Sequence, residues 1–143
     1  MRNGTTLVEL AVALMLLGVL TGLLSPKVTA FQDRAAVLEA REHFIALIVE
    51  VRRIATERGG AVLLVRSDPA EAILVAAGDT VRTFRWPASR GSPQVVIGGA
   101  RTDVALAFDR AGLGRFANAT IGFSRGGTTS EVVLSSYGRV RRR

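Results

Sequence analysis

The fold is decided by residues 5–24, TTLVELAVALMLLGVLTGLL, where one carboxylate, Glu9, interrupts an otherwise uncharged run. About 20 residues of helix span roughly 30 Å, which matches the hydrocarbon thickness of a bilayer. An ionised side chain is costly inside such a span, and it marks a functional position by default. We therefore treat Glu9 as a functional residue that needs a partner of opposite charge.

The charges around this run predict its orientation. Arg2 precedes the run and no acidic residue does, so the positive-inside rule places the N-terminus in the cytoplasm and the bulk of the chain outside. A cleaved secretory signal ending at Ala30 is the alternative interpretation. The position of Glu9, the length of the run and a helical pattern that continues through Ala30 argue against that cleavage.

Residues 27–60 are predicted to extend the helix in amphipathic form. Pro26 is expected to bend the helix without ending it, and Gly59 and Gly60 supply the stop. Apolar residues recur at steps of three and four, which predicts one buried stripe. The predicted stripe consists of Phe31, Ala35, Leu38, Ile45, Ile48, Val51 and Ala55.

The period of the pattern changes after Gly60, and residues 61–143 are predicted to form a small antiparallel sheet domain. Short β-rich stretches are separated by turn formers such as Gly126-Gly127. The predicted strands are residues 61–66, 72–77, 81–86, 94–99, 104–109, 120–124 and 130–136. One face of the sheet would cover the apolar stripe of the helix, giving an α+β domain.

The charge of the chain is strongly positive, with a net of +7 and one lysine, Lys27. Most arginines are scattered, but four lie within five residues near the end of the sequence. These are Arg139, Arg141, Arg142 and Arg143. Such a cluster attracts polyanions, although charge runs are often merely solvated, and both interpretations stay open.

Enzymatic chemistry finds little support in the sequence. There are no cysteines, and His43 is the only histidine, so no second histidine or thiolate completes a metal site. The glycine pairs lack the lysine and the spacing of a phosphate-binding loop. We expect no catalytic residue, no metal and no cofactor.

The N-terminal motif resembles the processing signal of type IV pilins and pseudopilins. Gly4 precedes Thr5, Glu9 lies four residues further on, and Pro26 ends the apolar stretch. The resemblance implies that residues 1–4 are a leader, removed between Gly4 and Thr5 by a prepilin peptidase that methylates the new N-terminus. It also implies that Glu9 neutralises the α-amine of a neighbouring subunit in the filament core.

Three later segments, residues 39–65, 106–115 and 131–141, resemble the GspH/FimT group of minor pilins and pseudopilins. The resemblance implies the pilin fold, a long N-terminal helix on an antiparallel sheet or pair of sheets. It divides the chain into a filament-core half-helix at residues 5–26, an amphipathic half-helix at 27–60 and a β-rich domain at 61–143. It further implies a single-pass protein of the bacterial inner membrane with a periplasmic globular domain.

The same resemblance implies two alternative functions. The first is a minor pseudopilin of type II secretion, assembled into the filament or at its tip. The second is a minor pilin of a type IV pilus that binds duplex DNA for natural transformation, with the arginine cluster as its site. The implied partners are other pilins or pseudopilins, the prepilin peptidase and the inner-membrane assembly platform.

Overall fold

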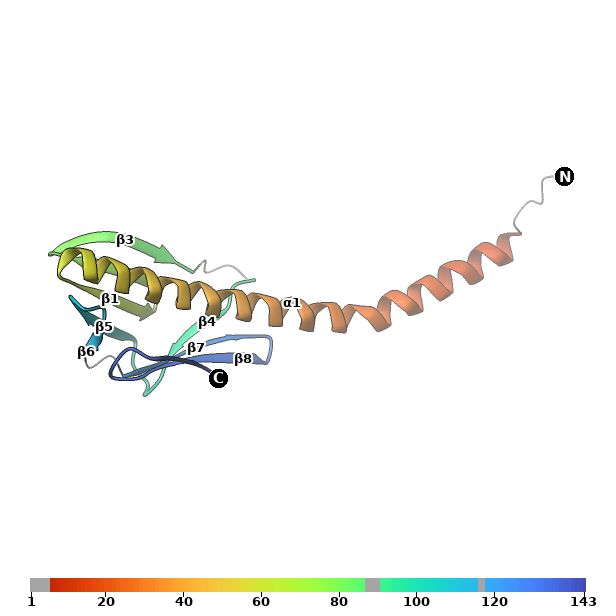
Figure 1. Cartoon of the computed structure of the whole chain (residues 1–143). Helices are drawn as coiled ribbons and strands as arrows, with labels where there is room; N and C mark the ends of the chain where they lie inside the picture. Colours follow the sequence, from red (N-terminus) through yellow and green to blue (C-terminus); the bar gives the residue numbers. More distant parts are fainter. Residues whose placement is uncertain (1–5, 87–90, 116–117) are drawn as a thin grey trace. The chain divides into compact units, whose positions relative to one another are not determined.

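The computed structural model describes residues 6–86, 91–115 and 118–143, with the backbone alone at residues 23–26. The long helix α1 (Leu7–Arg58) opens the chain, and strands follow it (Figure 1). The chain divides into two compact units, residues 1–32 and residues 33–143. The first part of α1 belongs to the first unit, and the remainder of α1 with the strands forms the second.

Helix α1 contains 52 residues and continues through Pro26. It ends at Arg58, directly before two glycines. Gly59 and Gly60 have φ angles of 81° and 143°, values that side-chain-bearing residues rarely adopt. The predicted stop is therefore confirmed, and its cause is the backbone conformation that leads into the first strand.

The buried stripe of the helix differs from the predicted one. Ile48, Val51 and Ala55 are buried as predicted, but Ala35 and Leu38 are exposed. Ile45 is half-buried, and Phe31, in the first unit, is 74% exposed. The buried residues are Val37, Ala40, Phe44, Leu47, Ile48, Val51, Ile54 and Ala55. The helix carries apolar residues on more than one face, and periodicity alone does not decide which face meets the sheets.

The first sheet has five antiparallel strands in the order β3-β2-β1-β5-β6. Its strands are β1 (Gly60–Ser67), β2 (Ala70–Ala76), β3 (Asp79–Arg85), β5 (Asp103–Asp109) and β6 (Gly114–Arg115). Burial alternates along β1, so that Leu63 and Val65 face the core while their neighbours are partly exposed. This alternation is the pattern of a sheet with one buried face.

The second sheet has four antiparallel strands in the order β4-β7-β8-β9. They are β4 (Gln94–Ile97), β7 (Ala119–Arg125), β8 (Thr128–Leu134) and β9 (Val140–Arg142). Each of the seven predicted strands overlaps an observed one. The sequence pattern missed β6 and β9, and β9 lies within the arginine cluster.

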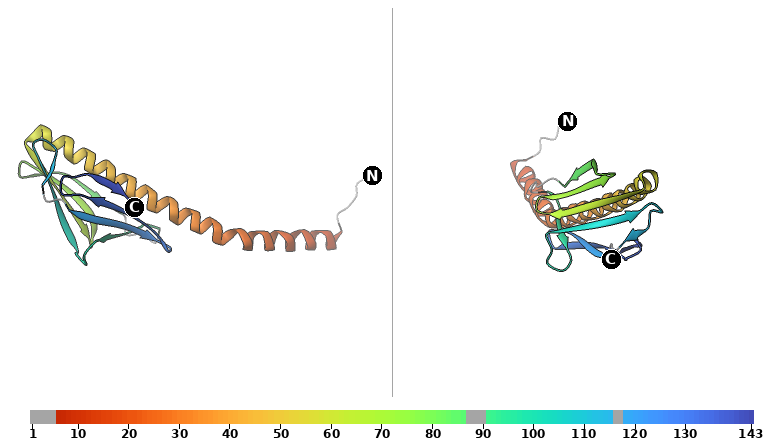
Figure 2. Two further views of the ribbon diagram at one scale, coloured as in Figure 1. Left: turned by 60° about the horizontal axis from the view of Figure 1, so that its bottom comes forward. Right: turned by 90° about the vertical axis from the view of Figure 1, so that its left-hand side faces the viewer.

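One hydrophobic core joins the helix of the second unit to both sheets. At its centre the ring of Phe44 lies 5.9 Å from that of Phe123 and 6.4 Å from that of Trp86, measured between centroids. Figure 2 shows the strands gathered along this part of α1. The α+β class is confirmed: a long N-terminal helix packs on antiparallel β-sheets.

Candidate functional site

The two processing residues of the N-terminal motif, Gly4 and Thr5, lie outside the described residues. Pro26 lies within α1, where the structure describes its backbone only. Glu9 lies in the first turn of the same helix and is exposed. The structure therefore gives side-chain geometry for one member of the predicted processing and assembly motif.

Glu9 forms a capping box with Thr6 at the start of α1. The backbone N–H of Thr6 donates to Glu9 Oε2 at 2.9 Å, and the backbone N–H of Glu9 donates to Thr6 Oγ1 at 3.3 Å. This reciprocal pairing satisfies two backbone donors that a helix leaves free at its N-terminus. Thr6 was missed as a site residue, although the spacing Thr-x-x-Glu before an apolar run signals this motif.

The first unit presents an exposed apolar surface on α1. None of its most apolar stretch is buried, and α1 is the one helix of the described chain that is long and apolar enough to cross a membrane. Its exposed large apolar side chains are Leu7, Val8, Leu10, Val12, Leu14, Met15, Leu16, Leu17, Val19, Leu20, Val28 and Phe31. A surface of this kind fits a membrane span or a signal anchor.

A hydroxyl inside this stretch is satisfied by the helix itself. Thr21 Oγ1 donates to the carbonyl oxygen of Leu17 at 2.5 Å. Such a bond to the preceding turn removes the need for a polar partner outside the helix. Between Leu7 and Thr21, Glu9 is the one ionisable residue of the sequence.

The four clustered arginines have two different environments. Arg142 pairs with Val132 in the β8–β9 ladder, and Val132 is fully buried, so Arg142 lies on the helix-facing side of the sheet. There its Nη2 lies 3.1 Å from Glu42 Oε2 on α1. Arg142 is therefore partly neutralised, which distinguishes it from the other three arginines of the cluster.

Glu42 also accepts hydrogen bonds from Arg41. The hydrogen bonds from Arg142 and then from Arg41 hold the pKa of the Glu42 carboxyl below its usual value. The same contact raises the pKa of Arg142. A glutamate between two guanidinium groups fastens the last strand of the sheet to the helix.

The other three arginines, Arg139, Arg141 and Arg143, make no ion pair with any described residue. Arg141 pairs with Val133 and Arg143 with Glu131, so both lie on the outer face of the sheet. Arg139, which lies two residues before Arg141, is exposed as well. Alternate residues of a strand are about 6.8 Å apart, so the backbone positions of the three arginines form a row along the edge of the second sheet.

Gly138, directly before Arg139, contacts α1 and β6. Arg52 Nη2 donates to the carbonyl oxygen of Gly138, and its guanidinium lies 5.7 Å from the centre of the Phe108 ring. A Cβ atom on Gly114 would lie 2.6 Å from the backbone nitrogen of Gly138. The chain before Arg139 is therefore closely packed.

His43, the only histidine, and Ser135, a hydroxyl before the arginine cluster, both have structural contacts. The His43 ring lies 5.6 Å from the Phe84 ring between centroids, and Ser135 Oγ accepts a hydrogen bond from the Arg139 N–H. Within the described residues no group of three or more acidic, histidine or cysteine side chains is placed to hold a metal ion.

Comparison with known proteins returns no relative: no family model, no curated protein and no solved structure matches the chain.

Removal of the Glu42 charge tests the contact between β9 and α1. Because the folded state lowers the pKa of Glu42, the contact stabilises the fold above the ordinary pKa of a glutamate, and this contribution is lost as the pH falls through the lowered value. We expect Glu42→Gln to be less stable than the parent near neutral pH, with a difference that shrinks in acid. Urea unfolding, followed by Trp86 fluorescence, measures this difference in the free energy of unfolding.

Glu57→Gln is the control for Glu42→Gln, because it removes an exposed ion pair with Arg53. An equal, pH-independent loss of stability in both variants would contradict the assignment of Glu42 as the contact between β9 and α1.

Proposed function

We propose that the chain is a minor subunit of a type IV filament machine. In this proposal the first part of α1 anchors the precursor in the bacterial inner membrane and then enters the apolar core of a filament. The second unit is the periplasmic globular domain. Of the two implied machines, our first candidate is the pseudopilus of a type II secretion system.

The exposed apolar surface of the first unit carries the proposal. These side chains need a lipid or protein environment, because nothing in the described chain covers them. A filament core is consistent with Glu9 at one end of this surface, since a buried carboxylate needs a counter-charge. The proposed counter-charge is the α-amine of a neighbouring subunit.

Replacing Gly4 by leucine tests the proposed processing. We expect the parent chain from the native host to begin at Thr5, and Gly4→Leu to remain a full-length precursor in the membrane, because the bulky side chain obstructs the peptidase. Intact-mass measurement distinguishes the two forms. Gly18→Leu introduces the same side chain at a position where an added Cβ meets no described atom within 4 Å beyond its chain neighbours and the nearby helix backbone, and it should be processed normally. Normal processing of Gly4→Leu would exclude a cut after this glycine.

A specific observation favours DNA binding as the second candidate function. Arg139, Arg141 and Arg143 lie along one edge of the sheet, and none forms an ion pair with a described acidic side chain, including Glu131, which is the cross-strand neighbour of Arg143. Guanidinium groups donate paired hydrogen bonds to phosphates, and several such contacts give a salt-sensitive site without sequence preference. The proposed ligand is duplex DNA, as in a minor pilin of a DNA-uptake machine.

A further inference from the structure

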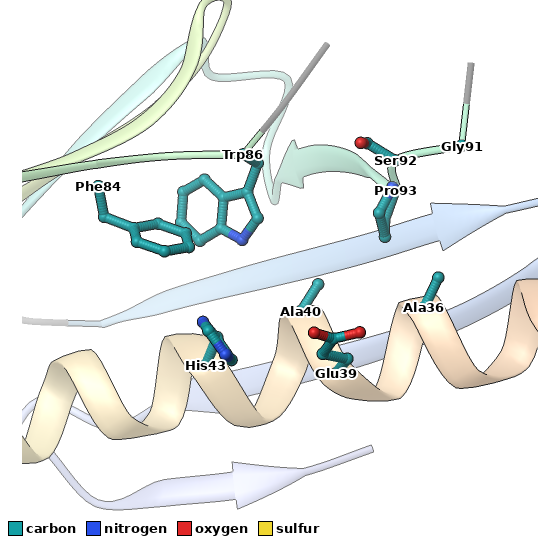
Figure 3. Close-up of a pocket in the computed structure, with 9 residues that line it drawn as sticks. All are labelled: Ala36, Glu39, Ala40, His43, Phe84, Trp86, Gly91, Ser92 and Pro93. Carbon is teal, nitrogen blue, oxygen red and sulfur yellow. The ribbon is translucent and has the colours of Figure 1, made fainter. Parts of the chain in front are cut away.

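A groove runs along the open side of strand β4. Among the described strands, β4 has one neighbour, β7, and lies at the edge of the second sheet. On its other side is a hollow of about 670 Å³, bordered by the β1–β2 turn, by Arg85 and Trp86, and by Gln94 to Val96. A smaller cavity of about 200 Å³ adjoins it between α1 and Trp86 (Figure 3). We call these two spaces together the edge groove.

The backbone of Val95 faces the edge groove. The Gly98 N–H donates to the Thr120 carbonyl at 2.8 Å, and the register continues from this pair along β4 and β7. Because hydrogen-bonded pairs alternate along an antiparallel ladder, Val95 is at a non-hydrogen-bonded position and directs its N–H and C=O to the open side. Further along, Ile97 is bridged to Arg101, so among the described residues the free edge is at Val95.

Trp86 supplies a second free donor. Its side chain is buried, with 5% of the residue exposed, and its Nε1 has no hydrogen-bond partner among the described residues. Figure 3 shows this nitrogen on the side of the ring that faces α1, above the cavity lined by Ala36 and Ala40. A buried donor without a partner is unusual, and the small side chains of the two alanines leave room for an acceptor beside it.

We propose that the edge groove binds an extended peptide segment of a partner protein, which adds to β4 as a further strand. Its main chain pairs with Val95, and one of its carbonyl groups accepts the Trp86 indole N–H. An extended peptide offers donors and acceptors in alternation together with a side chain for the cavity, which is the chemistry of strand addition. This inference goes beyond the proposed function and does not depend on it.

The cavity has the size of one side chain. At about 30 Å³ for each water-sized group, 200 Å³ holds roughly seven non-hydrogen atoms. A valine or leucine side chain with its adjoining carbonyl group, five or six non-hydrogen atoms, fits within this space. Phe84 and Pro93 line the cavity together with Trp86, so an aliphatic side chain would meet apolar surfaces.

The test uses the full chain in detergent micelles and the capped peptide acetyl-Thr-Leu-Thr-Val-Thr-amide. Trp86 is the only tryptophan, so its indole N–H gives a single resonance that reports on the cavity. We expect the peptide to shift this resonance in a saturable manner. The same peptide with methylated backbone nitrogens should not shift it, because strand pairing requires N–H donors. No shift up to about 5 mM peptide, or equal binding of the methylated peptide, would overturn the proposal.

A pair of leucine substitutions on α1 locates the binding site. Ala36→Leu fills the cavity and is expected to weaken peptide binding by roughly tenfold or more, because the peptide side chain loses its space. Ala46→Leu makes the same change at an exposed position of the helix, and its affinity should match that of the parent. Equal affinity of the parent and Ala36→Leu would contradict the assignment of the cavity.

Discussion

Replacing Glu9 by alanine is expected to remove the chain from filaments while leaving membrane insertion and the fold of the second unit intact. In the proposed filament the α-amine of a neighbouring subunit would stay in the apolar core without a counter-charge. Loss of one partner of a buried ion pair costs about 3–5 kcal/mol, which corresponds to a loss of incorporation of roughly a hundredfold to several thousandfold. Co-purification with the other filament subunits measures the effect.

The capping box gives Glu9 a second role, and Glu9→Gln separates the two. Glutamine at this position still accepts a hydrogen bond from the Thr6 N–H, as glutamate does in the structure, but it carries no charge. We expect Glu9→Gln to be as defective as the alanine variant. Thr6→Ala loses the cap, which is worth about 1 kcal/mol, and should assemble much better. Wild-type assembly of Glu9→Gln would show that the charge is not the assembly contact.

Replacing Arg139, Arg141 and Arg143 together by alanine is expected to flatten the salt dependence of DNA binding. A soluble fragment of residues 31–143 should bind duplex DNA with a dissociation constant in the micromolar range or weaker, and the logarithm of its affinity should fall linearly with the logarithm of salt. Each phosphate contact contributes a slope of about 0.9, so three contacts contribute up to about 2.7.

Arg53→Ala is the control for this variant, because Arg53 is an exposed arginine outside the cluster that pairs with Glu57. Its salt dependence should stay close to that of the parent fragment. Absence of binding at low salt, or a triple variant that binds as the parent does, would remove the DNA-binding function. The proposed role as a secretion pseudopilin would then remain, and Arg139, Arg141 and Arg143 would be solvated surface residues.

The strands and the end of the helix were predictable because their signals are local. Short β-rich stretches separated by turn formers such as Asp68-Pro69 and Gly126-Gly127 indicate the seven predicted strands, and Gly59 adopts the positive φ that ends α1. The buried stripe was less predictable, because Leu38 and Val49 are apolar yet exposed on another face of the helix. Only the position of the sheets decides which face is buried.

The arginine cluster and the edge groove depend on contacts distant in sequence. Strand β9 was missed because an arginine run lacks the apolar alternation of a strand, and its ladder with β8 and the contact of Arg142 with Glu42 hold it in place. The environment of the Trp86 indole likewise depends on Ala40, far along the chain. The Thr6–Glu9 cap, in contrast, is a local motif that the sequence already contains.

The most direct test of filament membership is mass spectrometry of filaments sheared from the native host. The proposal predicts that the purified filaments contain this chain at low abundance and that its first residue is Thr5. Recovery of the chain only as a soluble exported protein beginning at Phe31, or only in the membrane fraction with Met1 retained, would contradict it.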